Sequence, residues 1–159
     1  MKSLISISFI IVTSLLLFGC GKPDLVVTTL EVTGPSVINA ENSVEVPIRV
    51  VIRNQGNASA DTFKTAIDYT EPKGTFVVAF TVPGQTDIWY PKTSSPLASG
   101  GEVTFSGKVT FHPSLHGVTV SLNAIADSCS GDEFMPDYCR VNESNEENNK
   151  STSISLTLP

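Results

Sequence analysis

The segment "VEVPIRVVI", Val44–Ile52, decides the fold class because its apolar residues recur at every second position. In an extended chain, successive side chains point to opposite faces. One face therefore collects an unbroken apolar row, formed by Val44, Val46, Ile48, Val50 and Ile52. Glutamate, proline and arginine stand between the first members of that row. This period of two predicts a half-buried β-strand with one face in a core.

The same alternation recurs along most of the chain after residue 24. It is found in 25–32, 75–82, 103–111, 118–126 and 154–158, and more weakly in 63–69. Ile88–Tyr90 is a candidate for an eighth strand. Glycine, proline and asparagine clusters separate these segments, as turns require, and no segment after residue 20 has a helical period. The pattern predicts an all-β protein, an immunoglobulin-like antiparallel β-sandwich of about seven strands.

The first twenty residues have the organisation of a secretory signal peptide. One lysine precedes the apolar run 4–18, which is followed by Gly19 and Cys20. The run is short for a membrane-spanning helix. Its end, "LFGC" at 17–20, resembles the lipobox of bacterial lipoproteins; the alternative is an ordinary signal peptide with a chance cysteine. The resemblance implies cleavage after Gly19 and acyl chains on Cys20, and two or three chains hold a protein firmly at a membrane.

These features divide the chain into three parts. We expect a signal peptide over 1–19, a lipidated N-terminus with a very short tether over 20–23, and one domain over 24–159. The residue after the cysteine is Gly21. In enteric-type bacteria an aspartate at this position tends to retain a lipoprotein at the inner membrane, so its absence favours the outer membrane. The predicted location is therefore the bacterial cell envelope.

Two cysteines remain once Cys20 is acylated. In an exported and oxidising setting, Cys129 and Cys139 are expected to form a disulfide. The alternative is a pair of free or metal-bound thiols, but no histidine lies at a zinc-like spacing from them. The closed loop is short, so the bond would stiffen a local excursion more than it would hold the fold.

Charge and motif content argue against two function classes. The net charge is −6 and no basic patch is present, which disfavours nucleic acid as a partner. The motifs of serine hydrolases, phosphate-binding loops and zinc proteases are missing as well. The two histidines, His112 and His116, stand beside Pro113 and Gly117, where a turn is expected. We therefore expect a protein that is not an enzyme and has no catalytic residues.

Four motifs, taken in order, resemble those of one known family. They are "PDLVV" at 23–27, "VIRNQGNASADTF" at 51–63, "AD" at 126–127 and "VNESNEENN" at 141–149. Together they resemble the CARDB family, the cell-adhesion-related domain found in bacteria. The resemblance implies an immunoglobulin-like sandwich on exported, surface-associated proteins, with a loosely defined role in adhesion or spacing and no enzyme activity. Residues 71–101 and 127–143 look longer than in the family pattern.

The asparagines and glycine of these motifs are interpreted as turn-shaping residues. They are Asn54, Gly56, Asn148 and Asn149. Asparagine tolerates left-handed backbone and hydrogen-bonds to neighbouring amides, which suits the entry to the last strand. Glu143 and nearby asparagine side chains are expected to accept hydrogen bonds from backbone donors.

The acidic segment 127–143 raises a calcium hypothesis. Its weak candidate ligands are Asp127, Asp132, Asp137 and Glu143. Calcium takes six to eight oxygen ligands, but the acids here do not follow the regular loop spacing of an EF-hand. The alternative is a solvated acidic loop. We expect no other cofactor.

Trp89 and Tyr90 form the remaining candidate site. They could make a stacking platform for sugar rings or a contact for a protein partner, or they could cover one end of the core. The expected partners are the membrane, through the acyl chains on Cys20, and an unknown envelope protein or surface glycan. The sequence thus predicts a non-enzymatic, lipid-anchored binding or structural module, or alternatively a calcium-dependent glycan-binding domain.

Overall fold

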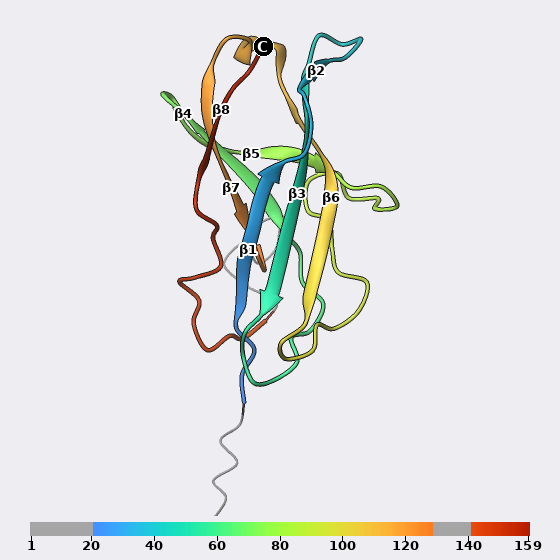
Figure 1. Ribbon diagram of the computed structural model, residues 1–159, viewed down its shortest axis with the longest axis vertical. Coiled ribbons are helices and arrows are strands. Elements are labelled where there is room, and N and C mark those ends of the chain that lie inside the picture. Colours follow the sequence, from blue (N-terminus) through green and yellow to red (C-terminus); the bar gives the residue numbers. More distant parts are fainter. Residues whose placement is uncertain (1–20, 129–140) are drawn as a thin grey trace, which may run out of the picture.

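The computed structural model describes residues 21–128 and 141–159, and in these ranges the chain is almost entirely strand and loop (Figure 1). The elements in order are β1 (Leu25–Val32), β2 (Val37–Ile38), β3 (Val44–Asn54), β4 (Ala66–Glu71), β5 (Gly74–Thr81), β6 (Glu102–Phe111), the 3₁₀ turn η1 (Pro113–Leu115), β7 (Thr119–Ile125) and β8 (Ile154–Thr157). The all-β prediction is confirmed. Within the same ranges, no helix is long and apolar enough to cross a membrane.

The strands form two antiparallel layers that share one strand. The hydrogen-bonded order is β1-β3-β6-β5-β4-β7-β8, with β2 paired to β3. Strand β5 joins the layers because its first part, Gly74–Val78, pairs with β4, whereas its last part, Ala79–Thr81, pairs with β6. The layers lie face to face across the core, so the immunoglobulin-like β-sandwich predicted from the sequence is confirmed.

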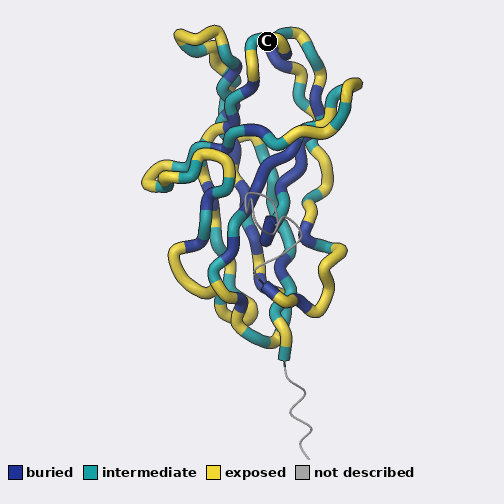
Figure 2. Tube along the Cα trace, turned by 180° about the vertical axis from the view of Figure 1, so that it is seen from behind, coloured by how far each residue is buried: buried dark blue, intermediate teal, exposed yellow. Residues whose placement is uncertain are grey.

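Strand β3 supplies the centre of the core. The side chains of its apolar row are at most 1% exposed, as the period-two pattern requires. Large side chains from both layers and the loops pack against them, among them Phe63, Phe80, Phe111, Leu122 and Leu158. Figure 2 traces these buried positions through the middle of the molecule. Each such burial contributes roughly 1.5–3 kcal/mol, so this cluster dominates the stability of the domain.

Two strand predictions differ from the structure. The eighth strand is β2 and not Ile88–Tyr90, because Asp87 Oδ1 accepts hydrogen bonds from the amides of Trp89 and Tyr90, both at 2.9 Å, and bends the chain there. Phe63 belongs to the core but precedes β4. Its backbone is bonded to Thr93 in the long loop instead of to a strand.

Where β5 pairs with β6, the backbone of β5 leaves no room for a side chain at Gly107. A Cβ on Gly107 of β6 would meet the carbonyl oxygen of Thr81, which is backbone and cannot rotate away. Gly107→Ala should therefore lower the free energy of unfolding by about 1–3 kcal/mol, measured by urea titration. In the control Gly34→Ala, the only near atom is Pro47 Cγ at 3.3 Å, and the loss should be smaller. Equal losses in the two variants would contradict this account.

Candidate functional site

The N-terminal segment lies between two loops that are distant in sequence. On one side, Gln55 N donates to Asp24 O at 2.8 Å and Asn57 N donates to Lys22 O at 3.1 Å. On the other side, Ser144 N donates to Pro23 O at 2.9 Å. We call this assembly of residues 22–25, 54–57 and 141–149 the N-terminal junction. It lies at the end of the sandwich where β1 begins (Figure 1).

Asn54 holds the first half of the junction with every polar group of its side chain. It is fully buried at the end of β3. Its Oδ1 accepts from Asp24 N and Gly56 N, both at 3.1 Å, and its Nδ2 donates to Ala58 O at 2.8 Å and Leu97 O at 3.0 Å. An amide is the side chain that can accept two bonds and donate two bonds at one place.

Gly56 is needed because the N-terminal segment passes directly over it. A Cβ at this position would meet Lys22 O, and it would lie 2.6 Å from Asp24 N. Both are backbone atoms, so no side-chain rotation relieves the contact. The Asn-x-Gly motif therefore places a hydrogen-bonding side chain, Asn54, two residues before a position that has no room for a side chain, Gly56. Together they allow the N-terminal segment to lie directly against residues 54–57.

Glu143 holds the second half of the junction. Its side chain is only 3% exposed, and its two oxygens accept from Leu25 N and from Asn149 Nδ2, the latter at 2.9 Å. Burial raises the pKa of the Glu143 carboxyl to about 7. The two hydrogen bonds lower this pKa, and the nearby carboxylates of Glu146 and Asp127 raise it. A backbone donor at the start of β1 thus depends on a side chain near the other end of the chain.

Asn148 and Asn149 act through their side chains. Asn148 Nδ2 donates to Asp24 Oδ1 at 2.8 Å, and Asn149 Nδ2 donates to Glu143. Neither adopts left-handed backbone; among the described non-glycine residues, only Asn42 and Asp127 have positive φ. In place of the expected left-handed backbone, Asn149 makes a bond within its own segment and Asn148 makes a bond to the start of the domain, which the local sequence pattern does not reveal.

The calcium candidates are only partly described. Asp132 and Asp137 lie outside the described residues, as do Cys20 and the Cys129–Cys139 pair. Asp127 is buried, and its Oδ2 accepts from Val141 N at 2.8 Å. No group of three or more acidic, histidine or cysteine side chains within 21–128 and 141–159 is arranged to hold a metal.

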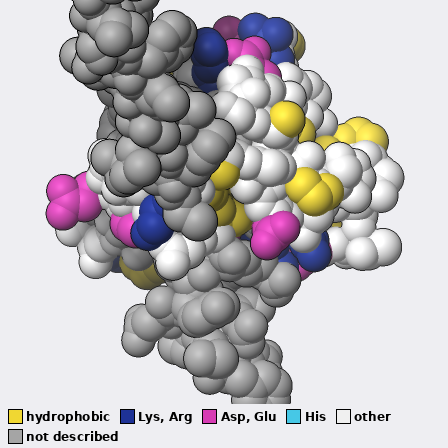
Figure 3. All heavy atoms as spheres, turned by 90° about the horizontal axis from the view of Figure 1, so that it is seen from below, with side chains coloured by type: hydrophobic (Ala, Val, Ile, Leu, Met, Phe, Trp, Pro, Cys, Tyr) yellow, Lys and Arg dark blue, Asp and Glu magenta, His cyan; other side chains and the backbone are white. Residues whose placement is uncertain are grey.

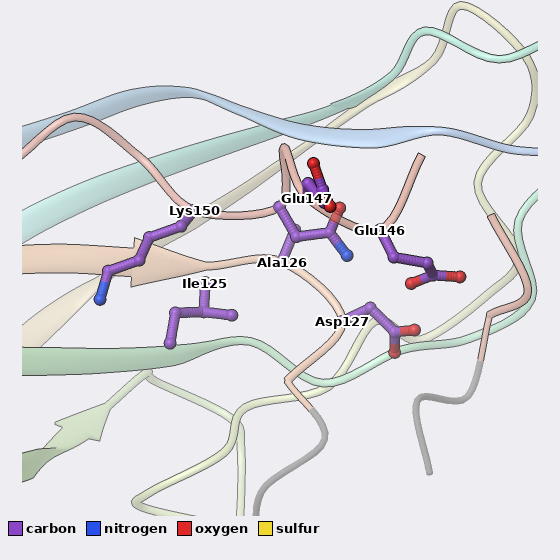
Figure 4. Close-up of a pocket in the computed structure, with 7 residues that line it drawn as sticks. Ile125, Ala126, Asp127, Glu146, Glu147 and Lys150 are labelled. Atoms are coloured by element: carbon purple, nitrogen blue, oxygen red, sulfur yellow. The ribbon is translucent and has the colours of Figure 1, made fainter. Parts of the chain in front are cut away.

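A cavity of about 190 Å³ lies beside these acids (Figure 4). Its lining residues are Ile125, Ala126, Asp127, Glu146, Glu147, Asn149 and Lys150. Glu146 Oε1 accepts from Glu143 N at 2.8 Å. Asp127 and Glu146 are thus both engaged by backbone amides, and this use of their carboxylates is structural.

Trp89 and Tyr90 have different neighbours. Tyr90 is partly buried, and Lys64 Nζ lies 5.6 Å from the centroid of its ring. Trp89 is 44% exposed and lines a second cavity of about 130 Å³, together with Tyr69 and His112. Sequence reasoning missed Tyr69 and His112, because they come from β4 and from the end of β6, and only the fold brings them to the loop.

Comparison with protein-family models gives one match. The CARDB model matches residues 22–153, which include the whole N-terminal junction. The chain belongs to the CARDB family. A comparison with curated proteins finds no match. The family resemblance inferred from the four motifs is confirmed. The junction explains three of those motifs physically, since Asp24, Asn54, Gly56, Glu143 and Asn148 all meet there, and Asp127 of the fourth motif is linked to it through Val141 N.

Asn54→Asp should destabilise the domain strongly. The carboxylate keeps the two acceptor functions but takes the donor away from the carbonyl of Ala58, whereas the carbonyl of Leu97 keeps the bond from Ala60 N. A buried group that loses its partner costs about 1–3 kcal/mol, so the free energy of unfolding should fall by at least about that amount in a urea titration. Asn145→Asp, at an exposed position of the junction, is the matched control and should change little. A mild effect of Asn54→Asp would argue against this assignment.

Glu143 should make stability depend on pH in an unusual direction. Its pKa is about 7 in the folded chain against an ordinary 4.5, so between these values the folded state holds a proton that the unfolded state has lost. Its contribution to stability is therefore full below pH 4.5 and declines as the pH rises to about 7, by on the order of 3 kcal/mol.

Glu143→Gln has no titrating carboxyl at this position, so comparing it with wild type isolates the pH dependence that Glu143 contributes. The difference in unfolding free energy between wild type and Glu143→Gln, measured by urea titration below pH 4.5 and above pH 7, should favour wild type more at the lower pH. Glu147→Gln changes an exposed carboxylate of the same loop and serves as control. A difference that is independent of pH would refute the raised pKa.

Proposed function

We propose that this protein is a non-enzymatic, lipid-anchored module of the bacterial envelope, which acts by binding a partner or as a structural part of a surface assembly. Membership of the CARDB family supports a bacterial adhesion-related module. The junction supports the anchoring role. Lys22, two residues after Cys20, is hydrogen-bonded through its backbone to Asn57 in both directions.

This connection matters mechanically. Lys22 and Pro23 were expected to belong to a tether, yet both are bonded into the domain. Lys22 Nζ also donates to Asn142 Oδ1 at 2.6 Å. Acyl chains on Cys20 would therefore hold the domain through Gly21 alone, with the junction facing the membrane and β2 and η1 at the opposite end. The domain would stand close to the lipid in a restricted orientation.

The surface at the junction end favours acyl chains as the source of membrane affinity. Figure 3 views this end, and basic and acidic side chains are interspersed on its described part. The net charge of the chain is −6. Attraction to anionic lipid requires a cluster of lysine and arginine residues, and residues 21–128 and 141–159 contain no such cluster along the sequence. Gly21, in place of an aspartate, favours the outer membrane.

Glycan binding is the second candidate function. The cavity beside Trp89 favours it, because an exposed tryptophan there adjoins hydrogen-bonding side chains. The calcium dependence of such binding through 127–143 stays a prediction, since two of its four candidate ligands lie outside the described residues.

Cys20→Ser should release the protein from the membrane. The variant lacks the acylated sulfur, so it should move from the membrane pellet to the soluble envelope fraction after cell breakage and ultracentrifugation. Cys129→Ser keeps the acylation site and should remain in the pellet. Retention of Cys20→Ser in the washed membrane fraction would disprove anchoring through this cysteine.

A further inference from the structure

A small cavity opens where β5 leaves β4 and joins β6. It is lined by Tyr69 of β4, Val77, Val78 and Ala79 of β5, Thr110 and Phe111 of β6, and the following His112, with Trp89 from the long loop. Its volume is about 130 Å³. Sites for drug-sized ligands enclose about 300–1,000 Å³, so this cavity receives a single ring or a single side chain.

The backbone around Trp89 is held by hydrogen bonds although the indole is not part of the core. Asp87 Oδ1 accepts from the amides of Trp89 and Tyr90, and Asp87 Oδ2 lies 3.6 Å from Lys64 Nζ. On the other side, Phe80 N donates to Ile88 O at 2.7 Å. The loop therefore orders the backbone that carries a 44%-exposed indole before any ligand arrives, which reduces the entropy lost on binding.

The cavity also offers polar side chains. His112 Nδ1 accepts from Ser114 N at 3.2 Å, so Nε2 is the other ring nitrogen with which His112 can hydrogen-bond a ligand. Burial and the charge of Glu71 raise the pKa of Tyr69, which keeps its hydroxyl protonated. Thr110 adds a second hydroxyl. Aromatic surface is thus combined with hydrogen-bonding side chains in one small space.

We propose that this cavity binds one neutral pyranose ring of a surface glycan. A pyranose has an apolar C–H surface that packs on aromatic side chains and a rim of hydroxyls that needs neutral hydrogen-bonding partners. The net charge of −6 and the carboxylate of Glu71 near Tyr69 disfavour anionic sugars. The proposal rests on the envelope-binding function proposed above and assigns it a site and a ligand class.

The cavity lies away from the proposed membrane side. Along β6, Glu102 pairs with Arg53 next to the junction, whereas Phe111 pairs with Val44 at the other end of β3. His112 directly follows Phe111, so the cavity belongs to the half of the sandwich remote from Gly21. A protein anchored at Cys20 would thus present this site to the surroundings.

A protein partner would use this region differently. Ile88 is 47% exposed and Phe76 is 44% exposed, and the Phe76 ring lies 5.6 Å from that of Tyr69. A protein partner would cover Ile88 as well as Trp89, because apolar contact area drives such binding. A sugar ring in the cavity would contact Trp89 and leave Ile88 uncovered, since Ile88 does not line it. Ile88 is therefore a matched control for Trp89.

Trp89 is the only tryptophan of the chain, so its fluorescence reports on the cavity directly. The full-length processed protein in detergent is titrated with glucose, galactose and N-acetylglucosamine, and with sialic acid as the anionic comparison. At least one neutral sugar should give a saturable emission change in the millimolar range, and sialic acid should give none. His112→Ala should weaken that affinity about threefold to tenfold, the effect of one hydrogen bond.

Retention on immobilised glycans that end in the sugar that binds tests whether Trp89 is required for binding. Trp89→Ala should abolish retention on them, and Ile88→Ala should retain as wild type does, with both variants folded by circular dichroism. The absence of a saturable change with every neutral sugar overturns the proposal. Equal loss of retention in both variants overturns the assignment of the sugar to this cavity, because Ile88 does not line it. Neither result affects membrane anchoring, which the fractionation of Cys20→Ser tests separately.

Discussion

The hydrogen bond from the backbone amide of Leu25 to the Glu143 carboxylate joins the start of β1 to the segment 141–149, and the rest of the N-terminal junction depends on this connection. Leu25 is fully buried at the first position of β1, and a buried amide without a partner is costly. A side chain 118 residues later in the chain supplies the acceptor. Burying a carboxylate is itself unfavourable, and the raised pKa of Glu143 measures that penalty. Asn149 offsets part of it by donating to the second oxygen.

Around this contact, hydrogen bonds join the CARDB motifs at 23–27, 51–63 and 141–149. The N-terminal segment is bonded along one side by Asn54, Gln55 and Asn57, and along the other by residues of 141–149. Asp24 is the shared acceptor, with Asn148 on one oxygen and Gln55 on the other. Gly56 permits the approach by lacking a side chain. A change in any one of these positions therefore affects how the chain enters the domain.

The sequence predicted the layers well and the long-range side-chain contacts poorly, for a physical reason. Alternation in Val44–Ile52 reports burial directly, because the strand period is fixed by backbone geometry. Asn148 looked like a local turn residue because its partner, Asp24, lies at the other end of the chain. Trp89 and Tyr90 are adjacent in sequence, yet of the two only Trp89 lines the cavity, in a loop that Asp87 bends by accepting from both of their amides.

The two ends of the sandwich differ in what their polar groups do, and this difference argues for a division of function. At the junction, Asn54, Glu143 and Asp24 have their side-chain oxygens and nitrogens engaged within the protein, so this end is built to hold the chain. At the cavity, the Asp87 carboxylate accepts hydrogen bonds from the loop's own amides, and the Trp89 indole stays 44% exposed. The bonds around Asp87 order a loop that carries an exposed indole beside a cavity, and a ligand bound there would cover apolar surface that the fold leaves open to water. This loop lies within 71–101, which the sequence predicts to be longer than in the family pattern, so specificity for a partner is expected to reside there.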